Sequence, residues 1–311
     1  MEAKTLLVTG GTGYIGSHTV VEVLEAPNRM GFDKIVIIDN LDNSNVGVLK
    51  NIEKITGHKL DQDFFFEECD IRDKQRLTEI FTKFKHIHSV IHFAGLKAVG
   101  VSVSQPLQYY DNNVGGTIAM LQVMQEFGCN NIIFSSSATV YGSQNPHAKE
   151  DDPVNNADIS NPYGQTKAMI EVILKDYAFS NKDFSAICLR YFNPIGAHKS
   201  GLIGEDPEGI PNNLMPYIQR IAGGKLPHLT VFGNDYNTRD GTGVRDYIHV
   251  TDLAKGHLAS LDKQANLQGW HTFNLGTGTG TTVLELVAAF EEVSGLKIQT
   301  IMGPRRPGDV D

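Results

Sequence analysis

The sequence has few cysteines, no leader pattern and no apolar run of membrane length. Its three cysteines, Cys69, Cys129 and Cys188, are odd in number and far apart, and none belongs to a C-x-x-C pair. Such usage favours a reducing compartment over a disulfide framework. No signal peptide opens the chain, since a strand-and-glycine pattern follows Lys4 at once. We therefore expect a cytoplasmic protein without a membrane partner.

Basic charge is scarce as well. The 311 residues carry 27 Lys and Arg against 36 Asp and Glu, a net charge of −9, whereas a nucleic-acid partner would need a basic surface. The eleven histidines form no H-E-x-x-H motif and no Cys/His cluster, so we expect no metal site. A hydrophobic content of 41% is that of an ordinary globular protein, long enough for one large domain or two smaller ones.

A glycine-rich segment near the N-terminus is the most informative feature that is present. Residues 8–17 read V-T-G-G-T-G-Y-I-G-S and place Gly10, Gly13 and Gly16 three positions apart, directly after an apolar run. Glycines also cluster in plain turns. Here they stand where a buried strand would pass into a helix, which lets the backbone approach a pyrophosphate at the helix N-terminus. The G-x-x-G-x-x-G spacing favours the short-chain dehydrogenase/reductase branch of dinucleotide-binding proteins.

The first 190 residues alternate β-branched runs with segments of helical period. The predicted strands are Thr5–Thr9, Lys34–Asp39, Phe64–Glu67, Ser89–Phe93, Asn131–Ser135 and Ser185–Tyr191, with helices near 14–25, 46–56, 73–84, 106–127 and 162–180. Such alternation predicts an α/β fold with a doubly wound, parallel (Rossmann-type) sheet. Ligands then bind at the carboxyl ends of the strands.

The texture of the sequence changes after Tyr191. Residues 193–245 are rich in Gly, Pro and Asn, with a predicted helix at Leu214–Ala222 and a strand at Leu229–Phe232. A βα unit follows, with a strand at Thr272–Leu275 and a helix near 283–294 that begins with a capping box. We expect an NAD-binding domain at 1–191, with a returning helical segment near 246–262. A smaller, mixed α/β substrate domain would occupy 192–311 and lack its C-terminal end.

An acidic residue at the end of the second predicted strand favours NAD over NADP. Asp39 follows Gly16 at about the 20-residue spacing expected of the carboxylate that holds the adenine ribose hydroxyls. This carboxylate would repel a 2′-phosphate, and the next residue is Asn40 rather than a cation. The alternative is a surface carboxylate at a strand end. Asp70 and Ile71 follow the third strand, where an aspartate would meet the adenine amino group.

A tyrosine and a lysine are spaced for acid–base chemistry. Tyr163 is the only one of ten tyrosines with a lysine four residues on, at Lys167, and Pro162 suits the first position of a helix. An ammonium near a phenol favours the phenolate, as would the positive nicotinamide ring of NAD⁺, so a phenol becomes a base at neutral pH. Residues 135–137, all serine, close the fifth predicted strand, where a hydroxyl would bond the reacting oxygen. The alternative is a structural tyrosine.

Several segments along the chain resemble the extended short-chain dehydrogenase/reductases. They read TGGTGYIGSH, HFAGLKAVG, SSSATVYG, NPYGQTK, LRYFNPIGAH and GTGVRDYIHV. As a set they most resemble the UDP-glucose 4-epimerase family, whose members interconvert UDP-galactose and UDP-glucose. The resemblance implies tightly bound NAD, a UDP-sugar substrate and a homodimer, in which the helices 106–127 and 162–180 pair with those of a second copy.

The resemblance implies a role for each member of the Tyr–Lys–Ser set. Tyr163 would take the proton of the sugar's 4-hydroxyl while the hydride of carbon 4 passes to NAD⁺. Lys167 would hold the nicotinamide ribose and tune Tyr163, and Ser137 would bond the 4-oxygen. The 4-keto sugar would then turn over and receive the same hydride on its other face. Transient oxidation avoids direct exchange of a C–H that is far too weak an acid.

The resemblance also transfers binding residues to this chain, position by position. Those expected to touch NAD are Gly10, Gly13, Tyr14, Ile15, Gly16, Asp39, Asn40, Asp70, Ile71, Phe93, Ala94, Gly95, Lys97, Asn112, Ser135, Tyr163, Lys167 and Phe192. Those expected to touch the UDP-sugar are Lys97, Ser137, Tyr163, Asn193, Asn213, Leu214, Leu229, Phe232, Arg245, Arg306 and Asp309, with Leu229 and Phe232 near uracil. The two arginines also suit a diphosphate on physical grounds, because a guanidinium bonds phosphate oxygens bidentately. The alternative is that either is an ordinary surface arginine.

Other functions are open to the same scaffold. A sugar-nucleotide 4,6-dehydratase or decarboxylase is one, but dehydratases place Thr-Asp-Glu after the fifth strand, where this chain has Ser137-Ala138-Thr139 without a carboxylate. A non-catalytic NAD-binding sensor would have no use for the Tyr163–Lys167 pair, and a sugar reductase would release its cofactor. In this family the acceptance of N-acetylated sugars depends on a pocket residue that aligns beyond Asp311.

Overall fold

Seven parallel strands form the main sheet of the molecule. The computed structural model describes residues 4–142, 147–207, 209–211 and 213–305. In spatial order the strands are β10 (Gly269–Leu275), β6 (Ser185–Tyr191), β5 (Asn131–Ser137), β4 (Ile87–His92), β1 (Thr5–Thr9), β2 (Lys34–Asp39) and β3 (Phe64–Glu68). The order reverses between β1 and β4, which is the place where doubly wound sheets bind dinucleotides. The predicted fold class is confirmed.

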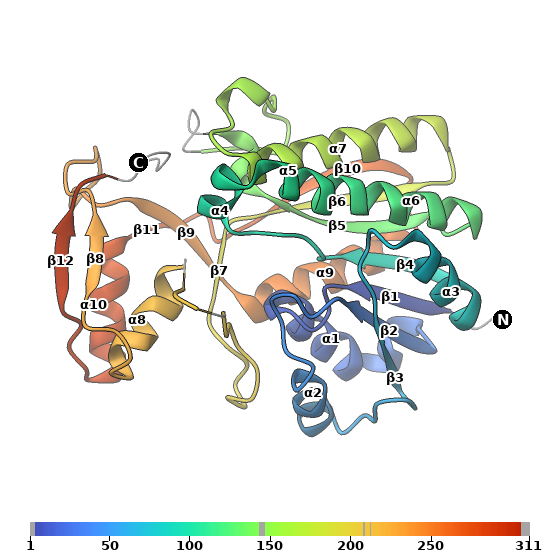
Figure 1. The fold of residues 1–311 in the computed structure, drawn as a ribbon, viewed down its shortest axis with the longest axis horizontal. Coiled ribbons are helices and arrows are strands. Elements are labelled where there is room, and N and C mark those ends of the chain that lie inside the picture. The colour runs from blue at the N-terminus through green and yellow to red at the C-terminus, as the bar shows by residue number, and fades with distance from the viewer. Residues whose placement is uncertain (1–3, 143–146, 208, 212, 306–311) are drawn as a thin grey trace.

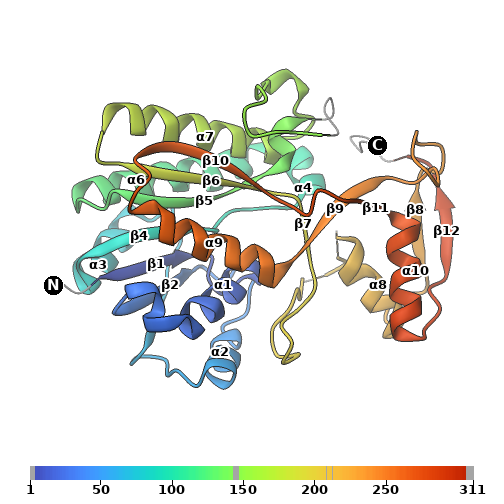
Figure 2. The ribbon, with the colours of Figure 1, turned by 180° about the vertical axis from the view of Figure 1, so that it is seen from behind.

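Helices cover both faces of this sheet (Figures 1 and 2). On one face lie α3 (Lys74–Phe84), α6 (Gly116–Glu126) and α7 (Pro162–Ser180); on the other lie α1 (Tyr14–Glu25), α2 (Val48–Thr56) and α9 (Val250–Gln264). Side chains alternate along each strand, so Leu7 and Val36 pack under the first layer, while Leu6 and Ile35 pack under the second. A sheet buried on both faces holds its carboxyl edge rigidly.

The predicted helix 106–127 is interrupted. It consists of α5 (Pro106–Tyr109), the π-helical turn η2 (Tyr110–Gly115) and α6, and it is preceded by the short helix α4 (Val99–Ser104). The π-turn places Asn112 and Asn113 inward, where both are buried. Such bulges recur at functional sites because they turn side chains out of the helical register.

One strand lies in a different place from the one expected. The segment 272–275 was predicted to belong to the smaller domain, but β10 pairs with β6 at the edge of the main sheet. That assignment is wrong because it followed position in the sequence. The pairing joins residues about 80 positions apart along the chain, which no local pattern reveals.

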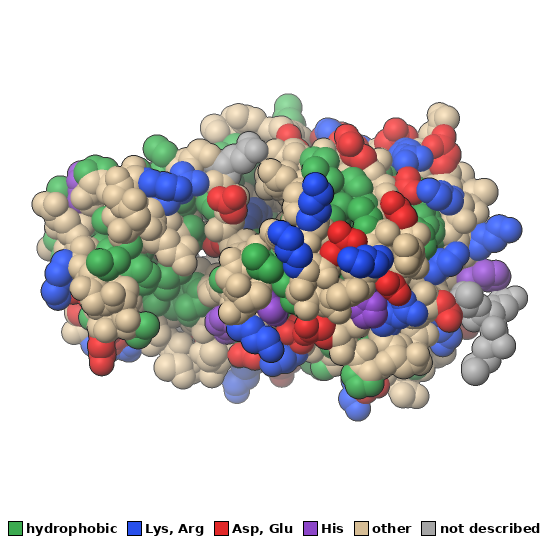
Figure 3. Space-filling model, turned by 90° about the horizontal axis from the view of Figure 1, so that it is seen from below, with side chains coloured by type: hydrophobic (Ala, Val, Ile, Leu, Met, Phe, Trp, Pro, Cys, Tyr) green, Lys and Arg blue, Asp and Glu red, His purple; other side chains and the backbone are tan. Residues whose placement is uncertain are grey.

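The remaining elements form a small lobe beside the carboxyl edge of the sheet (Figure 1). Here α8 (Leu214–Ala222) and α10 (Val283–Ser294) pack on the two-stranded sheet of β8 (Leu229–Phe232) and β12 (Thr300–Gly303). The expected capping box at Thr282 and Glu285 is present at the start of α10. Seen from below, the surface is hollowed between the lobe and the sheet, with Lys and Arg side chains nearby (Figure 3).

A three-stranded sheet connects the lobe to the main sheet. It contains β7 (Asn193–Ile195), β9 (Val244–His249) and β11 (Gly280–Thr282). The segment near 246–262 was predicted to be helical, yet residues 246–249 belong to β9 and the helix α9 begins at Val250. From there α9 runs against α1. No helix in the described ranges is long and apolar enough to cross a membrane.

Candidate active site

The glycine-rich turn between β1 and α1 leaves no room for a side chain. A Cβ on Gly16 would lie 2.2 Å from the carbonyl oxygen of Gly10, and a Cβ on Gly10 would lie 2.7 Å from the amide nitrogen of Ala94. Gly10 also has a φ of +67°, a conformation that favours glycine. The helix α1 begins at Tyr14 and Ile15, and no side chain caps it. This bare backbone at a helix N-terminus fits a pyrophosphate.

Asp39 ends β2 directly beside that turn. Its buried carboxylate accepts hydrogen bonds from the Thr12 amide at 3.2 Å, the Leu41 amide at 3.0 Å and the Ser44 hydroxyl at 3.0 Å. These three donors are neutral, and no cation is among them. Such a group suits ribose hydroxyls and disfavours a 2′-phosphate. Asn40, the next residue, is exposed.

Asp70 and Ile71 follow β3 in the adjoining loop. The Arg72 guanidinium bonds both oxygens of Asp70, at 2.7 and 3.0 Å, and these bonds hold the pKa of that carboxyl below its usual range. An adenine amino group would therefore share the Asp70 carboxylate with Arg72. Ile71 is buried and lies where a side chain on Gly116 would stand, so it closes the space between this loop and α6.

A buried histidine anchors the turn Phe93–Gly95 after β4. The Thr117 hydroxyl donates to the Asn113 carbonyl at 2.6 Å, so its oxygen accepts from His92 Nε2, 3.0 Å away. Nδ1 of the neutral ring then accepts from the Thr9 hydroxyl at 2.8 Å, and Thr9 Oγ1 in turn accepts from the Ala94 amide at 3.1 Å. Burial lowers the pKa of His92 to about 3, which keeps it neutral. The turn is thus fixed flat across the carboxyl edge.

Asn113 joins the same loop to the helix α7. Its side-chain oxygen accepts from the Leu96 amide at 2.8 Å and from Asn112 Nδ2 at 2.9 Å. Its amide nitrogen donates to the Leu96 carbonyl and to Thr166 Oγ1, at 3.0 and 3.1 Å. One buried amide therefore sets the distance between the loop that would face a cofactor and the helix that carries Tyr163.

Tyr163, Lys167 and Ser137 come together at the ends of β5 and α7. Asn161 caps α7 by accepting from the Gly164 amide, so Tyr163 occupies the first turn and Lys167 lies one turn on. Lys167 is buried, its ammonium donates to the Ser135 carbonyl at 2.5 Å, and it lies 5.7 Å from the centre of the Tyr163 ring. The Ser135 hydroxyl bonds Tyr191.

The hydroxyl of Ser137 can donate a hydrogen bond. Its oxygen accepts from the amide and the hydroxyl of Thr139, at 3.2 and 3.0 Å, which leaves its own hydrogen for another acceptor. Tyr163 lies within hydrogen-bonding reach of it. A substrate oxygen placed between these two hydroxyls would contact both.

Burial shifts the pKa of both members of the pair. It raises the pKa of Tyr163 to about 12, and the Ser137 hydrogen bond opposes this only in part. Burial also lowers the pKa of Lys167 to about 7, against the attraction of Glu171. The expectation that Lys167 and the nicotinamide ring of NAD⁺ together favour the Tyr163 phenolate stays a prediction.

Residues from two segments of the chain meet at Glu205. Lys97, from the loop after β4, donates to its carboxylate at 3.3 Å, and Asn213, which precedes α8, donates at 2.6 Å. Leu214 begins α8. Phe192 donates its amide to the Leu275 carbonyl, and Asn193 follows in β7. The structure thus brings Lys97 and Asn213 together at one carboxylate.

The remaining predicted substrate residues lie in the lobe or outside the described residues. Leu229 is buried in the lobe core with Ile218 and Val287, whereas Phe232 is about one-third exposed, at 37%. Arg245 stands on β9 and donates to the Val244 carbonyl at 2.6 Å. Arg306 and Asp309 lie outside the described residues.

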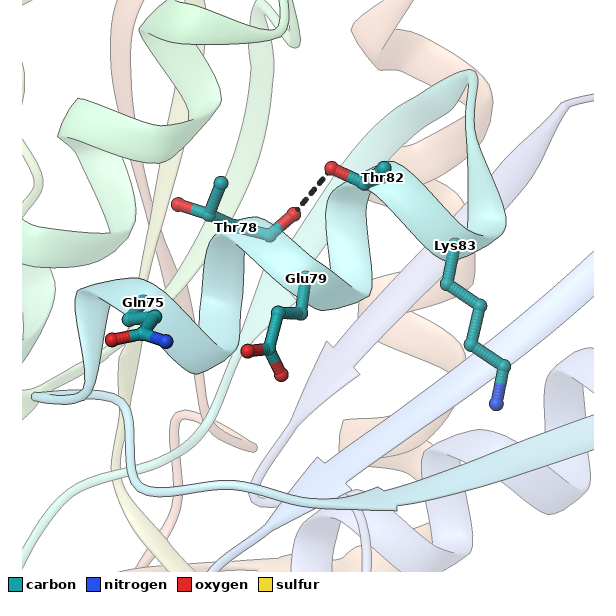
Figure 4. A pocket seen from close by; sticks show the side chains of 5 residues that line it. All are labelled: Gln75, Thr78, Glu79, Thr82 and Lys83. Carbon is teal, nitrogen blue, oxygen red and sulfur yellow. Dashed lines mark hydrogen bonds between the residues drawn. The ribbon is translucent and has the colours of Figure 1, made fainter.

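A separate hollow lies on the outer face of α3. It measures about 590 Å³, and its side chains all come from that helix: Gln75, Thr78, Glu79, Thr82 and Lys83 (Figure 4). None of the predicted site residues lines it. Among the described residues, no group of three His, Cys, Asp or Glu side chains is arranged to hold a metal ion.

Sequence reasoning missed Asn113, Glu205 and Glu171. Glu171 had a signal, since it continues the spacing of Tyr163 and Lys167 by another four residues on one helix face. Asn113 and Glu205 had none, because each has a decisive partner that is distant in the sequence: Thr166 for Asn113 and Lys97 for Glu205.

Comparisons with known proteins agree with this geometry. A profile of the NAD dependent epimerase/dehydratase family matches residues 6–276. UDP-glucose 4-epimerase 2 of Arabidopsis thaliana is 54% identical over 99% of this chain and 86% of its own length. UDP-glucose 4-epimerase of Bacillus subtilis (strain 168) is 53% identical over 98% and 86%. The crystal structure of UDP-glucose 4-epimerase from Bifidobacterium longum in complex with NAD⁺ and UDP is similar with a TM-score of 0.91 at 46% identity, over 98% of this chain and 88% of that one.

Proposed function

The chain belongs to the NAD dependent epimerase/dehydratase family, and we propose that it interconverts UDP-galactose and UDP-glucose by NAD-dependent epimerisation at carbon 4. The observation that carries this proposal is the meeting of Tyr163, Lys167 and Ser137 at the carboxyl edge of the sheet that also carries the glycine turn. The relatives named as UDP-glucose 4-epimerases support the choice of substrate.

We assign the cofactor to the edge where β1, β2 and β4 end. Gly10, Gly13 and Gly16, with Tyr14 and Ile15, would hold the pyrophosphate, because a side chain at Gly10 or Gly16 would collide with the backbone of the turn or its neighbour. The neighbouring positions would hold the adenosine and nicotinamide halves: Asp39, Asn40, Asp70, Ile71, Phe93, Ala94, Gly95, Lys97, Asn112, Ser135 and Phe192. When bound, NAD⁺ would supply the hydride chemistry of the reaction, which is the oxidation of carbon 4 of the sugar and its reduction again on the opposite face.

The catalytic residues move and hold protons around that exchange. Tyr163 takes the proton of the 4-hydroxyl and later returns it, while Ser137 donates a hydrogen bond to the same oxygen. The Lys167 ammonium, fixed by the Ser135 carbonyl, supplies positive charge beside the phenol. The UDP moiety would lie in the hollow with Lys97, Asn193, Asn213, Leu214, Leu229, Phe232 and Arg245 around it, and we retain Arg306 and Asp309 as expected partners.

The purified protein should convert UDP-galactose into UDP-glucose without added cofactor. A coupled dehydrogenase assay measures the product, and the NAD content of the dialysed protein is measured after denaturation. We expect close to one NAD per chain, because the cofactor must stay between the two half-reactions. A stable 4-keto-6-deoxy product would instead identify a dehydratase, and protein that needs added NAD(H) would point to a reductase.

We further propose that the protein is a cytoplasmic homodimer. The three cysteines are free and buried, which suits a reducing compartment. Exposed apolar side chains lie along the helices that would pair with a second copy: Leu107, Ile118, Met169 and Val172, the first of them 81% exposed. Such side chains on neighbouring helices favour burial against another chain.

The dimer should separate when a charge is placed among these side chains. Leu107→Glu would bury a carboxylate in the interface and shift the mass measured by light scattering from two chains to one. Val293→Glu is the matched control, since Val293 is 89% exposed on α10 in the small lobe. A wild-type protein that is monomeric at micromolar concentration would refute the dimer.

A further inference from the structure

A buried carboxylate lies directly behind the Tyr–Lys pair. Glu171 is on α7, one turn beyond Lys167, and only 4% of its surface is exposed. Its Oε1 accepts from the Ser136 hydroxyl at 2.5 Å and from Arg190 Nε at 3.0 Å, and its Oε2 accepts from Arg190 Nη2 at 2.7 Å. The proposed reaction described above makes no use of this group.

The ion pair with Arg190 is complete on both sides. Arg190, on β6, is 2% exposed, and its third nitrogen donates to the Tyr141 hydroxyl at 2.8 Å and to the Glu150 carbonyl at 3.2 Å. Tyr141 in turn donates to Asn274 of β10 at 2.7 Å. Burying two charges is costly unless their hydrogen bonds are satisfied, and here they are. The ion pair and its hydrogen bonds therefore hold β5, β6, β10 and α7 together rigidly.

Ser136 connects the Glu171–Arg190 ion pair to the active-site residues. It stands between Ser135, whose carbonyl holds the Lys167 ammonium, and Ser137, whose hydroxyl reaches Tyr163. Neighbouring side chains on a strand face opposite ways. Ser136 points toward Glu171 on α7, so Ser137 points the other way, toward the position proposed for the substrate. The bond from Ser136 to Glu171 thus fixes the end of β5 against the helix that carries Tyr163 and Lys167.

Glu171 is also the one anion among the described ionisable groups that face Lys167. These groups are Tyr163 and Glu171 on α7, His92 on β4 and Cys188 on β6. His92 and Cys188 stay neutral, since burial lowers the pKa of His92 to about 3 and raises that of Cys188. The Glu171 carboxylate therefore opposes the effect of burial and helps to keep Lys167 protonated.

We propose that Glu171 is a positioning residue for the reaction: it fixes Ser136, and with it the register of β5 on α7, and keeps Lys167 in its ammonium form. This inference rests on the proposed function for its kinetic consequences only. The contacts themselves predict a property of Lys167 that is measurable in protein without turnover.

Three variants separate the two parts of this role. Ser136→Ala removes the bond to Glu171 and leaves the ion pair intact, so kcat for UDP-galactose should fall about ten-fold with little change in KM. Glu171→Gln removes the charge, so the pKa of Lys167, followed by the ¹³Cε resonance of labelled lysine, should fall by about one unit. The alkaline limb of the kcat profile should move down by the same amount. Glu171→Asp keeps the negative charge but moves the carboxylate back by one methylene group. This variant should lower kcat, while the pKa of Lys167 stays close to its wild-type value.

The control is Ser89→Ala, which removes an equally buried strand hydroxyl at the start of β4, far from the carboxyl edge. It should keep wild-type kcat. A Glu171→Gln protein whose Lys167 titrates as in the wild type, or a Ser136→Ala protein indistinguishable from Ser89→Ala, would overturn the inference. If Glu171→Gln does not fold, Glu171→Asp and Ser136→Ala decide the matter. A wild type that lacks epimerase activity refutes the proposed function, whereas the Lys167 titration tests this inference independently.

Discussion

Tyr163→Phe should lower kcat for UDP-galactose by about a thousand-fold, the range expected when a general acid–base group is removed. Phenylalanine fills the same space but has no oxygen to take the proton of the 4-hydroxyl. Ser137 and Lys167 would remain in place, because neither is held by the Tyr163 oxygen alone: Ser137 is bonded by Thr139, and Lys167 by the Ser135 carbonyl. NAD content and KM should therefore change little.

Tyr177→Phe provides the matched control for this variant. Tyr177 lies on the same helix, and its ring packs against Phe184, 4.6 Å between centres, away from the sheet edge. It should turn over at the wild-type rate. A Tyr163→Phe protein that keeps more than about a tenth of the wild-type kcat would show that another group carries the proton, and the assignment of Tyr163 would have to be abandoned.

The parts of the fold that sequence could predict are those set by local pattern. The strands β1 and β2 are continuous apolar runs because they are buried on both faces, and α7 has its start marked by Asn161 and Pro162. The short strands β7, β9 and β11 could not be predicted, because each is recognised only by its pairing with another strand. Arg245, for example, pairs with Thr281 across a turn-rich segment that has no alternation of its own. Placement of β10 failed for the same reason.

In the candidate site, too, features set by sequence spacing could be predicted, whereas features set by the surroundings of a group could not. Spacing along one helix predicted that Tyr163 and Lys167 share a face, and the structure confirms it. The direction of the Tyr163 pKa shift could not be predicted, because it depends on how deeply the fold buries the phenol. The role of Glu205 could not be predicted either, since its partner Lys97 lies 108 positions away along the sequence.

The second large effect is expected from a substitution in the glycine turn. In Gly16→Ala the new methyl group would lie 2.2 Å from the Gly10 carbonyl oxygen and 2.7 Å from the Gly11 Cα, both backbone atoms that cannot step aside alone. The turn must open, which we expect to destabilise the protein by about 2 kcal/mol. Because the same backbone would hold the pyrophosphate, the purified variant should have lost most of its NAD, and kcat without added NAD should fall about a hundred-fold.

Gly100→Ala makes the same chemical change without the collision. Gly100 is also helical, on α4, and a Cβ there meets nothing within 4 Å. Alanine favours helices over glycine, so this variant should be as stable as the wild type or slightly more so, with its NAD retained. Thermal unfolding with and without added NAD measures both effects. If Gly16→Ala keeps a full complement of cofactor, the pyrophosphate does not lie on this turn; if it loses NAD while Gly100→Ala keeps it, closeness of the backbone is what the cofactor requires.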